Sequence, residues 1–307
     1  MDREGLFLPG QTLVVGLSGG PDSVFLLHFL GHLRAQYNLT LIAVHLDHGW
    51  RENSPQDAKF CAQLCAAANI PLVTKHLRDL PAQKSTGSLE QDARRARRHF
   101  FQEVAAAHQA DAIALAHHQD DVFETFFIRL IRGSGLTGLT SIRPRSGEYI
   151  RPLLELTKQE ILEYLDSNQI AYCHDQTNED ITFLRNAIRH KLLPAYRALD
   201  KRAEDNLQRT IEQLRQVDDY LEERAQHAYK GMVTDGWLNL DSFFELDAVI
   251  QHRVLLQWLI AAGVPFTPTE KFFAEITRFF KQPGSKTHAV SEQWKISKQK
   301  NRAAIKR

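Results

Sequence analysis

The sequence predicts an α/β protein, with a doubly wound parallel sheet covered by helices on both faces and a smaller, mainly helical C-terminal domain. In the first half of the chain, short and nearly continuous apolar runs alternate with segments of helical spacing, which is typical of parallel strands buried on both faces. From Ala203 onward this alternation gives way to a long polar helical segment. We therefore expect one domain over residues 1–196 and a second over residues 197–307.

The expected elements follow in chain order. Strands are expected at residues 11–17, 40–46, 71–76 and 111–116, and helices at residues 23–33, 54–69, 88–109 and 120–132. A further helix is expected at 156–168, because Thr157 and Glu160 have the spacing of a capping box. Helices are then expected from 203 to about 230, near 241–262 and at 269–280. The chain ends in a short, basic, partly alternating stretch.

Composition and the N-terminal residues indicate the compartment. Of the 307 residues, 43% are hydrophobic and 24% charged, as in ordinary globular domains. No basic region followed by an apolar stretch opens the chain, and no apolar run near the C-terminus approaches the ~20 residues of a membrane span. Three cysteines, Cys61, Cys65 and Cys173, do not form a disulfide framework. We expect a soluble cytoplasmic protein.

Charge is distributed unevenly along the chain. Residues 1–186 hold 18 basic and 22 acidic residues, whereas residues 187–307 hold 20 basic and 15 acidic ones. The last stretch, 281–307, has eight basic residues and the single acid Glu292. This asymmetry indicates a polyanionic partner for the C-terminal part, with a solvated basic tail as the alternative.

A short polar loop, Ser-Gly-Gly-Pro-Asp-Ser, separates the first expected strand from the first expected helix. Glycines in such a loop let backbone N–H groups approach a phosphate, and the helix N-terminus adds partial positive charge. The string has neither the Gly-Lys-Ser/Thr of a Walker A loop nor G-x-G-x-x-G. It resembles the pyrophosphate loop (PP-loop) of the N-type ATP pyrophosphatase superfamily. That resemblance implies that ATP is held by Ser18, Gly19, Gly20, Pro21, Asp22 and Ser23, with Asp22 facing a Mg²⁺ ion.

Acidic and imidazole groups gather where the fourth expected strand meets its helix, in the string His117-His118-Gln-Asp120-Asp121-x-x-Glu124. Asp121 and Glu124 are three residues apart and so share one helical face. Ligands of open α/β sheets bind at the carboxyl ends of the strands. A helix cap explains one aspartate, but not the doublet together with the histidines and Glu124.

Four further strings complete the pattern. They are the arginine-rich segment with Arg94, Arg95, Arg97 and Arg98, the glycine-rich segment 132–139, the pair Asp175 and Asn178, and Arg185-Asn-x-x-Arg189. The arginine-rich segment is also consistent with a charged helix face, and Arg185 and Arg189 with a helix face paired to acids. His45 and His48 on the second strand make a poor metal site, because the period of two separates their side chains.

In this order, the strings resemble the tRNA(Ile)-lysidine synthetase family over about residues 11–190. The resemblance implies a ligase that joins L-lysine to C2 of cytidine 34 in the CAU anticodon of tRNA(Ile) through an adenylated base. ATP is consumed to AMP and pyrophosphate, and the lysidine formed switches codon specificity from AUG to AUA. The implied partners are that tRNA, free L-lysine and ATP with Mg²⁺, without a membrane, and a homodimer is a candidate assembly.

The resemblance also implies roles for individual residues. The catalytic candidates are His117, Asp121 and Arg97; Asp22 and Asp121 hold Mg²⁺; His45 lines the ATP pocket; Glu124 and Arg185 bind lysine; and Arg94, Arg97 and Arg189 bind tRNA. The charge of the basic stretch 281–307, rather than the resemblance, adds Lys295 and Lys298 as tRNA-binding candidates. Two alternatives remain. A PP-loop tRNA sulfur transferase would use cysteines, but Cys61 and Cys65 are spaced for helix packing. A non-catalytic nucleotide-sensing module would have little use for the carboxylates.

Overall fold

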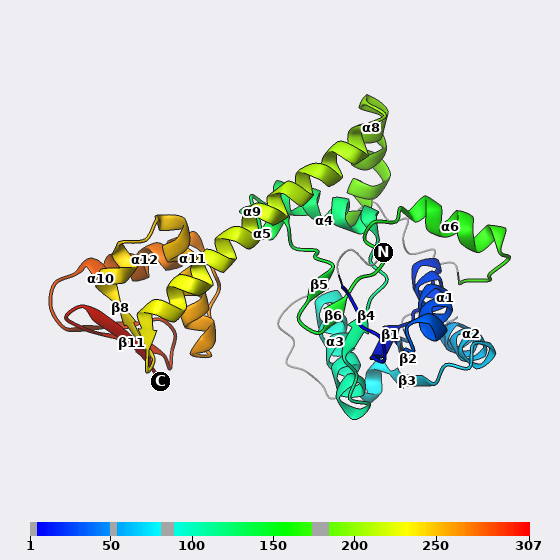
Figure 1. Cartoon of the computed structure of the whole chain (residues 1–307), viewed down its shortest axis with the longest axis horizontal. Helices are drawn as coiled ribbons and strands as arrows, with labels where there is room; N and C mark the ends of the chain where they lie inside the picture. The colour runs from blue at the N-terminus through cyan, green and yellow to red at the C-terminus, as the bar shows by residue number, and fades with distance from the viewer. Residues whose placement is uncertain (1–4, 50–53, 81–88, 174–183) are drawn as a thin grey trace. The chain divides into compact units, whose positions relative to one another are not determined.

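Figure 1 shows the chain as a computed structural model, which describes residues 5–49, 54–80, 89–173 and 184–307. The chain divides into two compact units, Met1–Gln208 and Arg209–Arg307. The expected boundary at 196/197 lies twelve residues before this division. The division falls inside the long helix α9 (Ala203–Met232), so the chain passes between the units without a loop.

The first unit is built on a six-stranded sheet of order β3-β2-β1-β4-β6-β5. All four expected strands are present, as β1 (Thr12–Gly16), β2 (Thr40–Asp47), β3 (Leu72–His76) and β4 (Ala112–Ala114), and they pair in parallel. Two strands of two residues each, β5 (Arg145–Ser146) and β6 (Tyr149–Ile150), extend the sheet. They are too short to show a hydrophobic period, and the sequence analysis did not predict them.

Helices cover both faces of this sheet. Leu13 and Val15 of β1 belong to one apolar core and Val14 to another, as the alternation of side chains along a strand requires. The first core is closed by α1 (Pro21–Gln36), α2 (Ser54–Ala67) and α6 (Lys158–Ser167), and the second by α3 (Leu89–Ala107). The parallel sheet buried on both sides is therefore confirmed.

The remaining helices of the first unit follow the sheet. They are α4 (Gln119–Ile131), α5 (Leu136–Leu139), α7 (Leu184–Ala187), one π-helical turn (Ile188–Leu192) and α8 (Leu193–Leu199). The predicted capping box opens α6, where Thr157 Oγ1 accepts from the N–H of Glu160 and the Glu160 carboxylate accepts from the N–H of Thr157.

The second unit contains helices, as predicted, and also a five-stranded antiparallel sheet. Its helices after α9 are α10 (Leu240–Phe244), α11 (Ala248–Ala261) and α12 (Glu270–Lys281). The sheet has the order β7-β8-β11-β10-β9, with strands Val233–Thr234, Trp237–Asn239, Arg302–Lys306, Lys295–Gln299 and Lys286–Ala289. The alternation noted at the end of the sequence belongs to this sheet. Strands of two to five residues are too short to predict a sheet by themselves.

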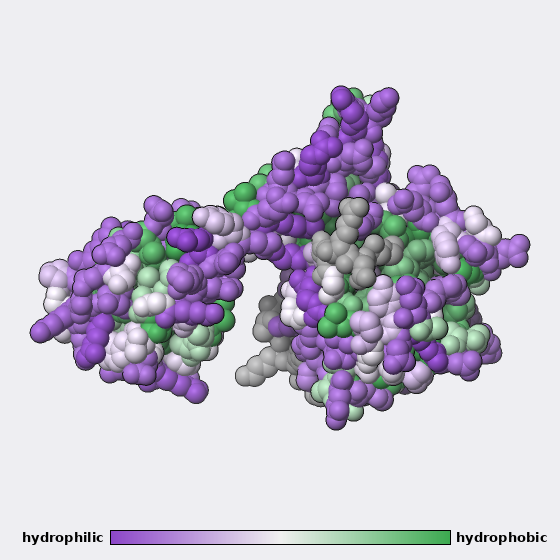
Figure 2. All heavy atoms as spheres, in the orientation of Figure 1, coloured by the Kyte–Doolittle hydropathy of each residue, from purple (hydrophilic) through white to green (hydrophobic). Residues whose placement is uncertain are grey.

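Apolar side chains of this unit pack between its sheet and its helices. Ile296, Ala303 and Leu238 from the sheet share one core with Trp258 and Phe280 from the helices. The visible surface is largely hydrophilic over both units (Figure 2). None of the helices in the described ranges combines the length and apolar character that crossing a membrane requires.

Candidate active site

The polar loop between β1 and α1 is held by its own serines. The Ser18 N–H donates to Ser23 Oγ at 3.1 Å, and the Ser23 hydroxyl donates to the Gly20 carbonyl at 2.9 Å. Gly19 has a φ of +87°, whereas Gly20, the N-cap of α1, has an extended φ of −72°. The backbone of this loop therefore needs glycine at position 19 but not, on conformational grounds, at position 20.

Two thiols pack beside Gly19. A Cβ atom at that position would lie 3.3 Å from both Cys61 Sγ and Cys173 Sγ. Burial raises the pKa of the Cys61 thiol to about 12 and that of Cys65 to about 11. The Cys61 and Cys65 thiols are therefore neutral at physiological pH, which supports their interpretation as packing residues.

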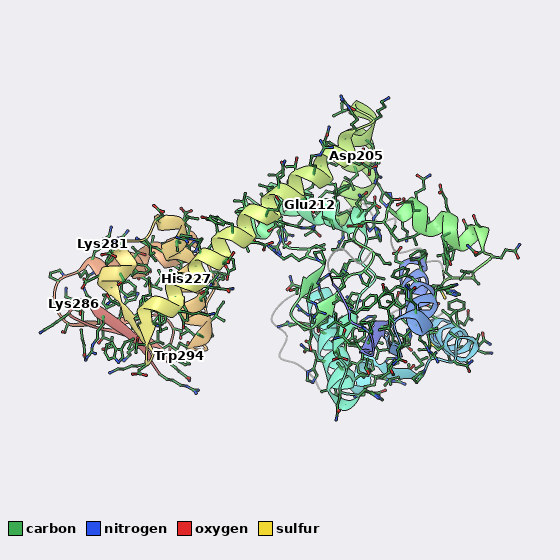
Figure 3. All side chains as sticks on the ribbon, in the orientation of Figure 1. Asp205, Glu212, His227, Lys281, Lys286 and Trp294 are labelled. Atoms are coloured by element: carbon green, nitrogen blue, oxygen red, sulfur yellow. The ribbon has the colours of Figure 1, made fainter. Side chains whose placement is uncertain are left out.

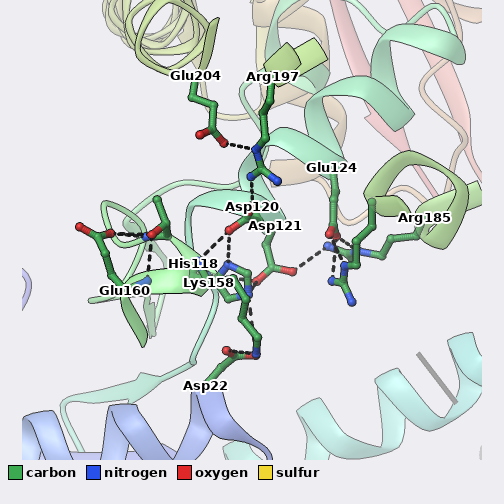
Figure 4. A network of polar contacts seen from close by, with 12 residues as sticks. Asp22, His118, Asp120, Asp121, Glu124, Lys158, Glu160, Arg185, Arg197 and Glu204 are labelled. Carbon is green, nitrogen blue, oxygen red and sulfur yellow. Dashed lines mark hydrogen bonds and ion pairs between the residues drawn. The ribbon is translucent and has the colours of Figure 1, made fainter. Parts of the chain in front are cut away.

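His118 joins the first turns of α1 and α4 (Figure 4). Its Nε2 lies 3.7 Å from the Asp22 carboxylate and 3.6 Å from that of Asp121, and its Nδ1 lies 3.5 Å from Asp120. His118 is also the N-cap of α4, and its backbone N–H donates to Asp121. Burial lowers the pKa of His118, but the three carboxylates outweigh burial and raise it above the usual value.

A lysine and an arginine that the sequence analysis did not select complete this network. Lys158 Nζ donates to Asp22, while the Lys158 backbone N–H donates to Asp120 at 2.8 Å. Arg197 donates to Asp120 and to Glu204. Burial favours the protonated form of Asp120, but the hydrogen bonds from His118, Lys158 and Arg197 prevail and lower its pKa. Nothing in the spacing of the sequence indicates these contacts, because they depend on how α1, α6 and α8 pack.

Glu124 is fully buried and receives two guanidinium groups. Arg185 Nε donates to it at 2.7 Å and Arg189 Nε at 2.6 Å, and Arg185 also reaches Asp121 at 3.1 Å. Arg185 and Arg189 are four residues apart and so share one face of α7 and the π-helical turn that follows it. The structure thus brings together four residues that were predicted from separate strings. Pairing with acids, the alternative noted for these arginines, is also observed.

His117 has a different environment from that of His118. Among the described residues, its buried Nδ1 has no hydrogen-bond partner. Burial lowers the pKa of His117 to about 4; Asp121 opposes this shift, and Arg151, Arg185 and Arg94 add to it. The imidazole is therefore uncharged at neutral pH, and its buried Nδ1 is left without a hydrogen bond.

His45 lies directly beside the loop. Its Nδ1 is 2.9 Å from the carbonyl oxygen of Leu17, and its buried Nε2 has no hydrogen-bond partner within the described part of the chain.

On α3, Arg94 and Arg97 are exposed, whereas Arg95 pairs with Asp92. The four arginines of this helix therefore do not act as one group.

The prediction that Lys298 binds tRNA does not agree with its place in the structure. Lys298 is only 6% exposed, and its Nζ donates to the carbonyl oxygens of Phe280, at 2.5 Å, and of Gln282. The ammonium satisfies the last carbonyls of α12 and is not available to a phosphate, whereas Lys295 is exposed.

Asp175 and Asn178 lie outside the described residues. Within those residues, no group of three or more His, Cys, Asp or Glu side chains is arranged to hold a metal ion.

Comparisons with known proteins identify the family and the fold. The sequence matches the family described as "PP-loop domain" over residues 4–196. The fold resembles the solved structure of the U34-tRNA thiolase NcsA from Methanococcus maripaludis, with a TM-score of 0.59 and 19% identity over 69% of this chain and 74% of that one. Together, the fold and the loop define a PP-loop protein of the ATP-binding class.

Curated relatives narrow the family. The tRNA(Ile)-lysidine synthase of Bacteroides thetaiotaomicron is 33% identical over 305 residues, which cover 98% of this chain and 68% of that protein. The synthase of Geobacter sulfurreducens is 42% identical over 240 residues, or 76% of this chain and 50% of that protein. The chain belongs to the tRNA(Ile)-lysidine synthase family. It spans about half the length of the Geobacter relative and 62% of the one from Geobacillus kaustophilus.

Proposed function

We propose that this chain ligates L-lysine to C2 of cytidine 34 in tRNA(Ile) with a CAU anticodon. The C2 carbonyl oxygen of the base attacks the α-phosphorus of ATP and releases pyrophosphate. The amine of lysine then attacks C2 and expels AMP. The observation that carries the proposal is the convergence of Asp22, from the loop, with Asp121 on His118, next to the Glu124–Arg185 pair.

The phosphates of ATP fit the loop and its surroundings. The N-terminus of α1 offers backbone N–H groups and partial positive charge, and the Lys158 ammonium lies beside Asp22. Preorganised donors of this kind stabilise the charge that develops on a leaving pyrophosphate. In this proposal His45 lines the nucleotide pocket, and the uncharged imidazole of His117 assists at the adenylation centre.

Magnesium fits the carboxylates of Asp22 and Asp121, because Mg²⁺ prefers oxygen ligands and usually combines one or two carboxylates with substrate phosphates. When bound, it would neutralise charge on the pyrophosphate. Both carboxylates lie within 3.7 Å of the same imidazole nitrogen, so they face a common space.

The reaction is assigned to the cytoplasm, and the homodimer stays a prediction.

Free lysine carries both a carboxylate and ammonium groups, and the pair of buried Glu124 and partly exposed Arg185 offers one partner of each sign. We assign the lysine carboxylate to Arg185 and an ammonium to Glu124, which Arg189 continues to neutralise.

For the tRNA we propose Arg94 and Arg97 on α3, with Arg189 at the edge of the site. Sulfur transfer is disfavoured because Cys61 and Cys65 are buried, neutral thiols.

The variant Asp121→Asn tests the assignment at the reacting centre. It should lower tRNA-dependent release of pyrophosphate on the order of 10²-fold, because a charge that orients the leaving group is lost. Asp79→Asn is the matched control, since Asp79 is an exposed aspartate of the same unit. If the Asp121 variant releases pyrophosphate at the wild-type rate with tRNA present, the role given to this carboxylate is wrong.

A further inference from the structure

The C-terminal sheet has one face that its helices do not cover. Leu238, Ala303 and Ile296 point toward α11 and α12 and are buried, so their neighbours along each strand point the other way. We call this second side the outer face. It consists of Thr234, Trp237, Ala304, Ser297 and Thr287 in a central row, with Asn239, Arg302 and Gln299 on one side and Lys306, Lys295 and Ala289 on the other.

The outer face is basic and has no acid of its own. Its charged residues are Lys295, Arg302 and Lys306, all exposed, and none of its eleven members is a carboxylate. Lys295 and Lys306 are paired directly across β10 and β11. Like charges placed opposite one another destabilise a sheet, so this pairing has a cost that a bound anion would remove.

An aromatic residue lies among these cations. Trp237 is half-buried and its register neighbours, Thr234 and Ala304, are small. The Arg302 guanidinium lies 4.4 Å from the centre of the indole ring. The guanidinium thus lies over the ring, and a planar cation stacked on an aromatic ring offers its outer plane to an unpaired base.

Other surfaces of this unit are less suited to a polyanion. The part of α9 that lies in this unit, residues 209–232, carries five acidic and four basic side chains, and Figure 3 labels one of the acids, Glu212. The sequence analysis expected a polyanionic partner for the C-terminal part and named Lys295 and Lys298 for the tRNA. The net negative charge of α9 argues against the helix, and the burial of Lys298 removes one cation from the tail.

We propose that the outer face of the β7–β11 sheet is an RNA-binding surface for the body of the tRNA substrate. Lys295 and Lys306 contact phosphates, and the Trp237–Arg302 pair stacks on an exposed base. The proposal rests on the proposed function, because that function requires a tRNA. It adds the surface, the stacking residue and the cations that take part.

The triple variant Lys295→Gln, Arg302→Gln and Lys306→Gln tests the phosphate contacts in the full chain. We expect tRNA affinity at low salt to fall at least about tenfold, and the slope of log affinity against log salt to decrease in magnitude by about 2 to 3. The control is Lys230→Gln, Lys271→Gln and Lys281→Gln, which removes the same charge from exposed lysines of α9 and α12 and should leave the slope nearly unchanged.

Trp237 separates stacking from charge. Trp237→Ala should weaken tRNA binding without changing the salt slope, and Trp237→Phe should restore most of the affinity. Unfolding midpoints of all variants, together with ATP affinity, report whether the fold is retained. Wild-type affinity and slope in the triple variant would overturn this proposal alone, whereas a wild-type chain that binds no tRNA would contradict the proposed function as well.

Discussion

Gly19 and Gly20 stand side by side in the loop but have different reasons to be glycine. Gly19 adopts a φ of +87°, where side chains are strained, and two thiols lie close to where its Cβ would be. Gly20 has an ordinary φ, and the nearest atom to a Cβ there is Ser18 Oγ at 3.6 Å. The sequence predicted that both are needed for close approach to phosphate; the structure adds a conformational requirement at Gly19 only.

Alanine at each position separates the two requirements. Gly19→Ala should lower the free energy of unfolding by about 1–3 kcal/mol and weaken ATP binding, because the loop backbone is strained. Gly20→Ala should leave the free energy of unfolding nearly unchanged, so any loss of ATP affinity there measures steric blocking of the phosphate. Equilibrium ATP binding and denaturant unfolding check both variants. Equal stability of the two would refute the conformational argument.

His118 gives the site a dependence on pH. Its pKa is raised in the folded chain, so the stability that it contributes is fully present below its unfolded pKa, about 6.5, and is lost as pH rises through the folded value. We expect the difference in unfolding free energy between wild type and His118→Asn to be largest below pH 6.5 and to shrink above it. Asparagine is chosen because it keeps the N-cap of α4. A difference that grows above pH 6.5 would contradict this account.

At the scale of elements, the sequence predicted those whose side chains show a period. The strands β1 to β4 are apolar runs, and the capping box at Thr157 marks the start of α6. The loop and the histidine–carboxylate string were also readable, because each is contiguous. Lys158 and Arg197 were not, since their contacts with Asp22 and Asp120 join segments that are distant in the sequence.

Lys298 shows how burial reverses the meaning of a charge in a basic segment. Lys298→Met should lower the unfolding free energy by about 1–3 kcal/mol, because two carbonyl oxygens at the end of α12 lose their donor. Lys295→Met, three residues away on the same strand and exposed, is the matched control and should have little effect. Denaturant unfolding of the two variants is the measurement. Similar stability of both would mean that the Lys298 contacts are energetically unimportant.

At the scale of the whole molecule, the two units differ in net charge, and we assign them different substrates. The N-terminal unit holds every residue proposed to contact ATP and lysine, and the C-terminal unit holds the outer face proposed for tRNA. The chain spans 50–68% of the length of the relatives compared above. Whether 307 residues suffice for the complete reaction is thus the central question.

The central claim is that this chain by itself ligates lysine to tRNA(Ile), and incorporation of labelled lysine tests it most directly. The purified chain is incubated with ATP, Mg²⁺ and labelled L-lysine, together with tRNA(Ile) carrying a CAU anticodon or the same tRNA with uridine at position 34. We predict that one lysine enters each CAU-anticodon tRNA, with equimolar AMP and pyrophosphate, and that the uridine variant remains unlabelled. An absence of label from both tRNAs, or equal labelling of both, would contradict the account.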